Sequence, residues 1–187
     1  MNSYPTAPPE PDLASDFRGA MRRSAASASL ITTSLPSGDV AGMAATSVCS
    51  LSLSPPALLV CVNQVTHTHS VLHASQRFCV NFVRVEDRLV CESFGRASVH
   101  QERFSTGCWI RDVDDLPLLQ TALANILCVV DGQFAYGTHT VFIGRVHKVI
   151  LREQSAPLLY HDGSYGRFSA FIDDGADARV EADRRRS

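Results

Sequence analysis

The amino-acid sequence predicts a mostly β fold, namely a closed antiparallel barrel with peripheral helices. Short apolar runs rich in β-branched residues recur along the chain, and such runs are typical of strands. Helical patterns are few and do not alternate regularly with these runs, which argues against a doubly wound parallel sheet. The length of 187 residues fits one domain with a sizeable core. We therefore expect five to seven strands and two or three short helices.

Six segments carry the strand pattern. The residues 35–39 have turn chemistry, and the pair Pro55-Pro56 ends the structure that precedes it. Residues 95–117 are expected to be irregular, and residues 131–137 are expected to be a loop between two long strands. The expected strands are Ala28–Thr33, Ala57–Val62, Phe78–Val83, Ala122–Val130, Thr138–Leu151 and a short last strand at Leu158–Tyr160.

Three segments carry a helical pattern. The first runs from Asp16 to about Ala26, where Phe17 and Met21 share one face. The second is one or two turns at His69–Ser75, and the third is Glu86–Phe94. Apolar residues of the third segment are expected to face the core.

The ends of the chain differ in composition from its middle. We expect a disordered, Pro-rich leader at residues 1–15, a folded domain at 16–172 and a charged, flexible tail at 173–187. The N-terminus has no basic start and no apolar stretch, so it does not read as a secretory signal. The six cysteines form no CxxC pair and fit core positions in a reducing cytoplasm, although their even number leaves a disulfide framework open.

Charge and hydropathy exclude two classes of partner. Lys+Arg 17 against Asp+Glu 19 gives a net charge of −2, so we expect no general affinity for nucleic acid. No run approaches the roughly 20 apolar residues that a membrane-spanning helix needs, so we expect no membrane partner. The charged fraction of 19% is low and favours an oligomer.

The first segment with candidate chemistry is 42–54, which is rich in small residues and hydroxyls. Thr46, Ser47 and Ser50 lie within it, and their hydroxyls can donate to the oxygens of a polar ring or a phosphate. Small residues let a ligand approach the backbone closely. The alternative is a plain strand with alternating serines on its solvent face.

The second segment, 63–70, follows a buried strand and leads into a helical pattern. Thr66, Thr68 and Ser70 lie where a helix N-terminus would offer N–H groups to an anion, although simple capping explains them equally well. His69 and His73 are four residues apart, as zinc ligands on a helix can be. No acidic residue or cysteine lies at a matching spacing, so we expect no metal site.

The third segment, 137–146, places a histidine after a glycine turn. His139 begins a long strand, and Gly144 inside that strand indicates close approach by another backbone or a ligand. A lone histidine is often structural, so its spacing alone leaves its role open. The chain has no GxSxG, P-loop or GxGxxG motif, which argues against an α/β-hydrolase and against nucleotide binding by either familiar loop.

In this order, the segments resemble the short-chain flavin reductase family, the reductase components of two-component flavin monooxygenases. The matching pieces are FRGAMRRSAASASLITT, GMAATSVCSLSLSPPALLVCVN, THTHSVLHASQRFCVNFV, GTHTVFIGRV and PLLYHDGSYGRF, within about residues 16–168. The resemblance implies a flavin reductase-like, FMN-binding split β-barrel that forms a homodimer. It also implies reduction of FMN or FAD by NADH or NADPH, with release of reduced flavin to a partner monooxygenase.

The resemblance also implies roles for individual residues. His139 would face the nicotinamide and act as the catalytic residue, and Tyr165 would close the site. Thr66 and Thr68 would hold the phosphate. The remaining residues would line the flavin: Ala45, Thr46, Ser47, Ser50, Cys61, Val62, Asn63, Asn81, Phe82 and Val83.

One departure from the family pattern keeps alternatives open. The family commonly has Gly-Asp-His before the strand, and this chain has Gly137-Thr138-His139. The acid would orient the imidazole or raise its pKa, and Thr138 removes that charge. The alternatives are a non-catalytic flavin carrier and a split-barrel oxidoreductase similar to the pyridoxamine-phosphate oxidases.

Overall fold

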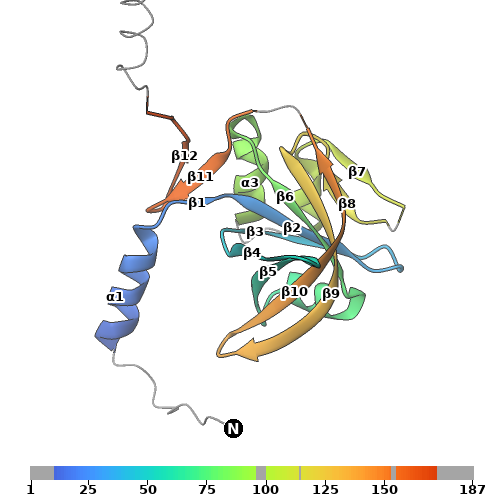
Figure 1. The fold of residues 1–187 in the computed structure, drawn as a ribbon, viewed down its shortest axis with the longest axis horizontal. Helices are drawn as coiled ribbons and strands as arrows, with labels where there is room; N and C mark the ends of the chain where they lie inside the picture. The colour runs from blue at the N-terminus through green and yellow to red at the C-terminus, as the bar shows by residue number, and fades with distance from the viewer. Residues whose placement is uncertain (1–10, 96–99, 114, 153–154, 172–187) are drawn as a thin grey trace, which may run out of the picture.

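A computed structural model describes residues 11–95, 100–113, 115–152 and 155–171 of the chain. Its centre is a seven-stranded antiparallel sheet (Figure 1). In spatial order the strands are β3 (Val40–Ala45), β2 (Ser29–Ser34), β6 (Arg77–Phe82), β9 (Ala124–Tyr136), β10 (His139–Leu151), β5 (Pro56–Asn63) and β4 (Val48–Leu53). The prediction of an antiparallel, mostly β fold is confirmed.

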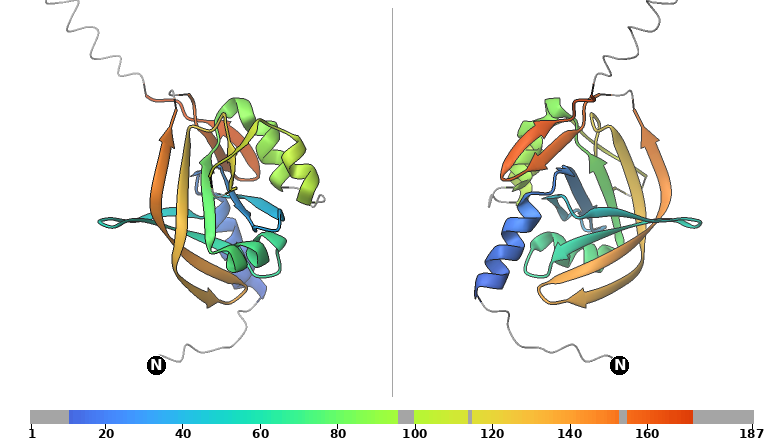
Figure 2. Two further views of the ribbon diagram at one scale, coloured as in Figure 1. Left: turned by 90° about the vertical axis from the view of Figure 1, so that its right-hand side faces the viewer. Right: turned by 60° about the vertical axis from the view of Figure 1, so that its left-hand side comes forward.

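The sheet coils into a split barrel rather than a closed one. Strands β3 and β4 are the two ends of the sheet, although only Thr46 and Ser47 separate them in the chain. Figure 2 shows the coiled sheet from two further sides. The expectation of complete closure was therefore wrong, and the barrel opens at the Thr46–Ser47 bend. We call this bend the seam.

Smaller elements surround the barrel. A three-stranded sheet has the order β1 (Ala26–Ser27), β11 (Leu158–His161) and β12 (Ser164–Arg167), and β7 (Trp109–Arg111) pairs with β8 (Pro117–Leu119). The helices are α1 (Pro11–Arg22), α2 (His67–Ser75) and α3 (Arg88–Gly95), with 3-10 turns η1 (Val85–Asp87) and η2 (His100–Ser105). None of these helices, within the described part of the chain, has the length and apolar character needed to cross a membrane.

Three expected boundaries were wrong. Helix α1 begins at Pro11, so residues 11–15 of the expected leader are helical, whereas residues 1–10 and 172–187 lie outside the described residues. Residues 131–136 continue β9 instead of forming a loop, because they pair with β10 as far as Tyr136 opposite His139. Part of the segment 95–117, expected to be irregular, forms η2 and β7.

The core lies inside the barrel and under α3. Strand alternation sends one side chain in two to the interior, which gives β5 its regular change between buried and half-buried positions. The barrel interior holds Ile31, Leu58, Val60, Val62, Leu72, Phe78, Val80, Cys128 and Phe142. A second cluster under α3 holds Ala28, Leu30, Val83, Val90, Cys91, Phe94, Leu119, Ala122 and Leu158.

Gly144 sits where this core is most crowded. A Cβ at Gly144 would lie 2.4 Å from Cζ of Phe78 and 2.8 Å from Cβ of Cys128. The close approach expected at this glycine is therefore made by a buried aromatic ring of the chain itself. The missing side chain lets β10 pass directly over Phe78.

We predict that Gly144→Ala lowers the free energy of unfolding by about 1–3 kcal/mol, because the added methyl group overpacks the core. Urea denaturation followed by circular dichroism measures the change. Gly132→Ala on the same hairpin is the control, since its Cβ would meet Ile143 at an ordinary 3.6 Å. Equal unfolding midpoints for the two variants would contradict the prediction.

Candidate functional site

The seam brings together hydroxyls and backbone from both ends of the sheet. Ser47 Oγ donates a hydrogen bond to the backbone oxygen of Cys61 at 3.1 Å, which ties the bend to β5. Thr46 is exposed, and Ala45 is half-buried at the end of β3. The bend therefore presents small residues and hydroxyls at the opening of the barrel, and the flavin contacts expected from them stay a prediction.

His139 lies beside the seam on the outer face of the sheet. It is opposite Asn63 in the ladder between β10 and β5. Two residues further along β10, and hence on the same face, Val141 is opposite Cys61. Residues directly opposite each other in an antiparallel ladder share a face, so His139, Asn63 and Cys61 lie on the same side. The Thr138 hydroxyl is hydrogen-bonded to Nδ1 of His139 at 2.9 Å, which restrains the rotation of the imidazole ring.

A hollow of about 210 Å³ opens on the other side of the seam. We call it the tyrosine hollow, and it is lined by Ala28, Ala44, Ala45, Thr46, Cys91, Gly95, Tyr160 and Tyr165. The rings of Tyr160 and Tyr165 contact edge to face, with centroids 5.3 Å apart. Burial, and after it the hydrogen bond with the Cys91 thiol, raises the pKa of Tyr165, so its hydroxyl stays protonated at neutral pH.

The lining of the tyrosine hollow fits a planar, partly polar ring. Alanines and a glycine leave room beside the backbone, and two aromatic rings give flat walls. The hydroxyl of Thr46 in this lining can hydrogen-bond the polar edge of such a ring. The residues present are therefore suited to an isoalloxazine, the ring system of a flavin.

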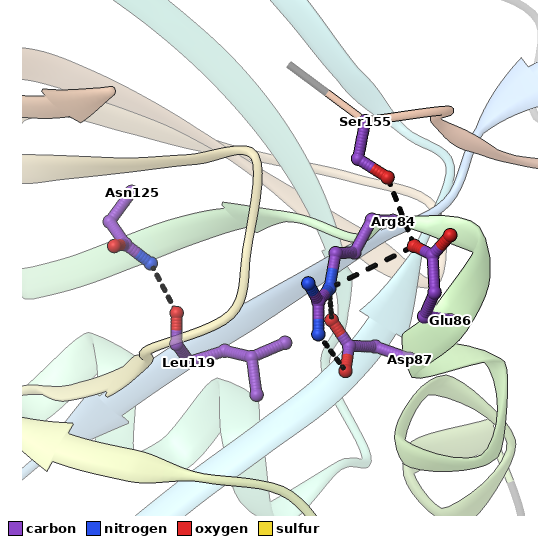
Figure 3. A network of polar contacts seen from close by, with 6 residues as sticks. All are labelled: Arg84, Glu86, Asp87, Leu119, Asn125 and Ser155. Carbon is purple, nitrogen blue, oxygen red and sulfur yellow. Dashed lines mark hydrogen bonds and ion pairs between the residues drawn. The ribbon is translucent and has the colours of Figure 1, made fainter. Parts of the chain in front are cut away.

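The hairpin that carries both tyrosines is anchored to the end of β6 by backbone and side-chain contacts. Leu158 N–H donates to the Val83 oxygen at 2.9 Å, and Val85 N–H donates to the Ala156 oxygen at 3.0 Å. Arg84 forms an ion pair with Asp87, with Nε 2.7 Å from Oδ2 (Figure 3). These contacts fix the position of β11, and hence of the tyrosines.

A second part of this network, also drawn in Figure 3, adds Glu86 and Ser155. Ser155 Oγ donates to Glu86 Oε2 at 3.0 Å, on the segment that leads into β11. Backbone hydrogen bonding, then the Ser155 hydroxyl, lowers the pKa of the exposed Glu86 carboxyl. The carboxylate therefore stays ionised at neutral pH and keeps Ser155 beside η1.

The start of α2 does not present both threonines as expected. Thr66 caps the helix, because its hydroxyl accepts from His69 N–H at 3.2 Å and donates to the Asn63 oxygen at 2.7 Å. Thr68 is 1% exposed, so its side chain faces the interior. Helix capping therefore accounts for the position of Thr66. The Thr68 hydroxyl is buried in this structure, so it is not available to a phosphate at the surface.

The histidines of α2 contact polar partners on β10 and β9. His69 Nε2 lies 2.9 Å from Thr140 Oγ1, and the His73 ring lies within hydrogen-bonding distance of Gln133. Burial, followed by repulsion from His73, lowers the pKa of His69. Within the described residues, no group of three or more His, Cys, Asp and Glu side chains is arranged to hold a metal ion.

Several expected flavin contacts are core residues instead. Val62, Asn81 and Val83 are fully buried. Strand alternation explains this for Val62 on β5, whereas β6 is covered on both faces, because its four central residues are all buried. Asn81 donates to the Leu30 oxygen and accepts from Leu119 N–H and from Asn125 Nδ2, at 2.8–2.9 Å. Their side chains were therefore wrongly assigned to the flavin.

Phe82 and Ser50 also lie outside the lining of the tyrosine hollow. Phe82 is half-buried and packs against the barrel core, and Ser50 is exposed on β4 opposite Leu58. The sequence reading missed Tyr160, which pairs with Tyr165 across the β11–β12 turn. The sequence did predict a short strand at Leu158–Tyr160, which contains this tyrosine. Only the turn at residues 162–163, however, shows that Tyr160 and Tyr165 meet.

Fold and site together define the class of protein: a split β-barrel with a hollow for a planar cofactor at its seam. The family model described as "Flavin reductase like domain" matches residues 21–169. The chain therefore belongs to the flavin reductase-like family, as the sequence resemblance indicated.

Relatives and solved structures agree with this assignment. "FMN reductase (NADH) RutF" of Stutzerimonas stutzeri is 36% identical over 160 residues, covering 86% of this chain and 91% of the relative. The reductase component of the FADH(2)-dependent resorcinol hydroxylase of a Rhizobium species is 38% identical over 152 residues, covering 80% and 84%. A homologue of nitrilotriacetate monooxygenase component B from Mycobacterium thermoresistibile superposes with a TM-score of 0.78 at 28% identity, covering 87% and 94%.

We predict that Asn81→Ala lowers the free energy of unfolding by roughly 2–4 kcal/mol, because Asn125 and the backbone of Leu30 and Leu119 lose buried partners. The affinity for FMN of the folded protein should stay within about twofold, since the Asn81 side chain does not line the tyrosine hollow. Urea denaturation and fluorescence titration with FMN measure the two quantities. Normal stability with lost FMN binding would show that Asn81 contacts the flavin after all.

Proposed function

We propose that this protein is an NAD(P)H-dependent flavin reductase, which transfers a hydride from NADH to FMN or FAD and supplies reduced flavin to a partner monooxygenase. The observation that carries the proposal is the oriented His139, held by Thr138 beside the same seam that forms the tyrosine hollow. The relatives named as FMN reductase and as a hydroxylase reductase component support the reaction and the partner.

In this proposal the protein positions the reactants. A bound flavin would supply the hydride-accepting ring. Ala45 and Thr46 would hold that ring against the β3 end of the seam, and Tyr165 would close the hollow opposite them. His139 would orient the nicotinamide carboxamide or donate a proton as the hydride arrives.

Thr138 takes over one task of the acid that is common in this family. A carboxylate would both orient the imidazole and add a negative charge. The hydroxyl of Thr138 meets Nδ1 of His139 at 2.9 Å, so it orients the ring without adding charge. This contact favours a reductase over a flavin carrier, because a carrier has no need of an oriented histidine.

We also propose that the protein acts as a homodimer in the cytoplasm. Exposed apolar side chains on α1 and on the β9–β10 arm support an interface: Leu13, Phe17, Met21, Phe134 and Tyr136. All six cysteines are free, which suits a reducing compartment. Burial raises the pKa of Cys128 to about 12, so this thiol is inert at neutral pH.

We predict that His139→Ala slows anaerobic reduction of FMN by NADH at least tenfold, because a group on the nicotinamide side is lost. The dissociation constant for FMN should change less than about twofold. Stopped-flow absorbance gives the rate, and repeats with FAD and NADPH give both preferences. If the wild-type protein binds FMN but NADH does not bleach it, the reductase proposal fails and the carrier takes its place.

We predict that Thr138→Val slows the same step by about three- to tenfold, because the imidazole loses one orienting hydrogen bond. Thr138→Ser, which keeps the hydroxyl, should stay near the wild-type rate. The measurement is the limiting rate of flavin reduction at saturating NADH. Equal rates for the valine and serine variants would show that the Thr138 contact has no part in catalysis.

A further inference from the structure

A second hollow lies between α1 and the seam. It measures about 360 Å³, and we call it the arginine hollow. Its lining is Arg18, Met21, Arg22, Ser24, Ala26, Thr46, Ser47 and Tyr160. Nothing in the reaction proposed above uses this space.

The arginine hollow continues the tyrosine hollow. Both are lined by Thr46 and Tyr160, so a ligand in one reaches the other past these two side chains. A ligand that spans both is longer than a single ring system. The shared boundary would therefore let one ligand with two parts occupy both hollows.

The chemistry of the second part follows from charge. Arg18 and Arg22 are one helical turn apart and lie on the same face of α1. Arg22 Nε pairs with Asp162 Oδ1 at 3.1 Å, which leaves the other donors of its guanidinium available. Within the described part of the chain, no carboxylate is paired with Arg18. Two guanidinium groups, of which Arg22 is paired with the Asp162 carboxylate, favour an anionic ligand, and phosphate oxygens suit the guanidinium fork.

The rest of the lining suits a heterocycle and a sugar. Met21 offers an apolar surface and Tyr160 an aromatic one, on which a base can stack. Ser24 and Ser47 supply hydroxyls near the two arginines. The site therefore combines phosphate-binding, sugar-binding and base-binding groups in one hollow.

We propose that the arginine hollow binds the adenosine diphosphate portion of a dinucleotide whose redox-active ring occupies the tyrosine hollow or stacks beside it. The inference rests on the proposed function, which supplies two such dinucleotides, FAD and NAD(P)H. Arg18 and Arg22 then contact the diphosphate. Helix α1 is the element that distinguishes a dinucleotide from FMN, which lacks the adenylate.

The anchoring of α1 fits this assignment. Arg22 joins the helix to the β11–β12 turn twice, through Asp162 Oδ1 and through its own backbone oxygen, which accepts from Asp162 N–H at 3.0 Å. Figure 1 shows α1 leaving the body of the molecule at β1, β11 and β12. A ligand in the arginine hollow would contact α1 on one side and the seam on the other, and would therefore hold the helix against the barrel.

The test is equilibrium binding to Arg18→Gln, with Arg23→Gln as the matched control, because Arg23 carries the same charge directly after the end of α1 and lies outside the hollow. Calorimetric titrations use ADP, FMN, FAD and NADH as separate probes, without turnover. Arg18 is exposed, so the variant should fold, and thermal melting checks this. We expect ADP affinity to fall about tenfold in Arg18→Gln and to stay unchanged in Arg23→Gln.

The other probes identify the dinucleotide. If Arg18→Gln binds FAD tenfold more weakly and FMN with unchanged affinity, the hollow holds the adenylate of the flavin dinucleotide. If it binds NADH tenfold more weakly and FAD with unchanged affinity, the hollow holds the adenylate of the nicotinamide dinucleotide. Equal binding of all probes by both variants would overturn the inference, and so would an FMN affinity that falls as far as that of FAD. Failure of the wild-type protein to reduce FMN would instead refute the proposed function, and ADP binding would still decide the inference.

Discussion

The organisation of the molecule depends on one topological constraint: β3 and β4 are consecutive in the chain but lie at opposite ends of the sheet. The two residues between them must cross from one end of the coiled sheet to the other, so the barrel stays open there. Backbone groups at such an opening need partners. Ser47 supplies one by donating to the Cys61 oxygen. Both hollows and His139 lie beside this opening.

An opening is useful for binding only if its walls are rigid, and a buried amide network provides that rigidity. Asn81 on β6 joins β2 through the Leu30 oxygen and β8 through Leu119 N–H. Asn125 on β9 extends the network to Arg152, whose Nη2 donates to its side-chain oxygen at 3.0 Å. Buried polar groups with satisfied partners specify one arrangement of the strands they join. The polar residue that resembled a ligand contact therefore acts on the site indirectly, by fixing the strands behind it.

The sequence was informative where structure is local. β-branched and apolar runs located β2, β5, β6, β9, β10 and β11, whereas β3 and β4 were not among the expected strands. Alternation places Val62 inside, between Cys61 and Asn63 on the outer face, so this residue was predictable as core. Asn81 was not, because its polarity suggested a ligand, and only the long-range partners Leu30 and Leu119 show that its hydrogen bonds are satisfied internally. The continuation of β9 past Asp131 escaped prediction for the same reason, since pairing with β10 decides it.

Helix α1 shows how an element outside the barrel becomes part of the site. Its 12 residues are near the lower limit for a helix that is stable alone in water, and its apolar residues Leu13, Phe17 and Met21 remain exposed. The contacts of Arg22 with Asp162 hold only its C-terminal end, and both side chains are exposed, so this ion pair contributes little stability. A ligand beside Arg18 and a second subunit on Leu13 and Phe17 would cover adjoining faces of the helix that meet at Met21, so ligand binding and subunit assembly can stabilise the same element.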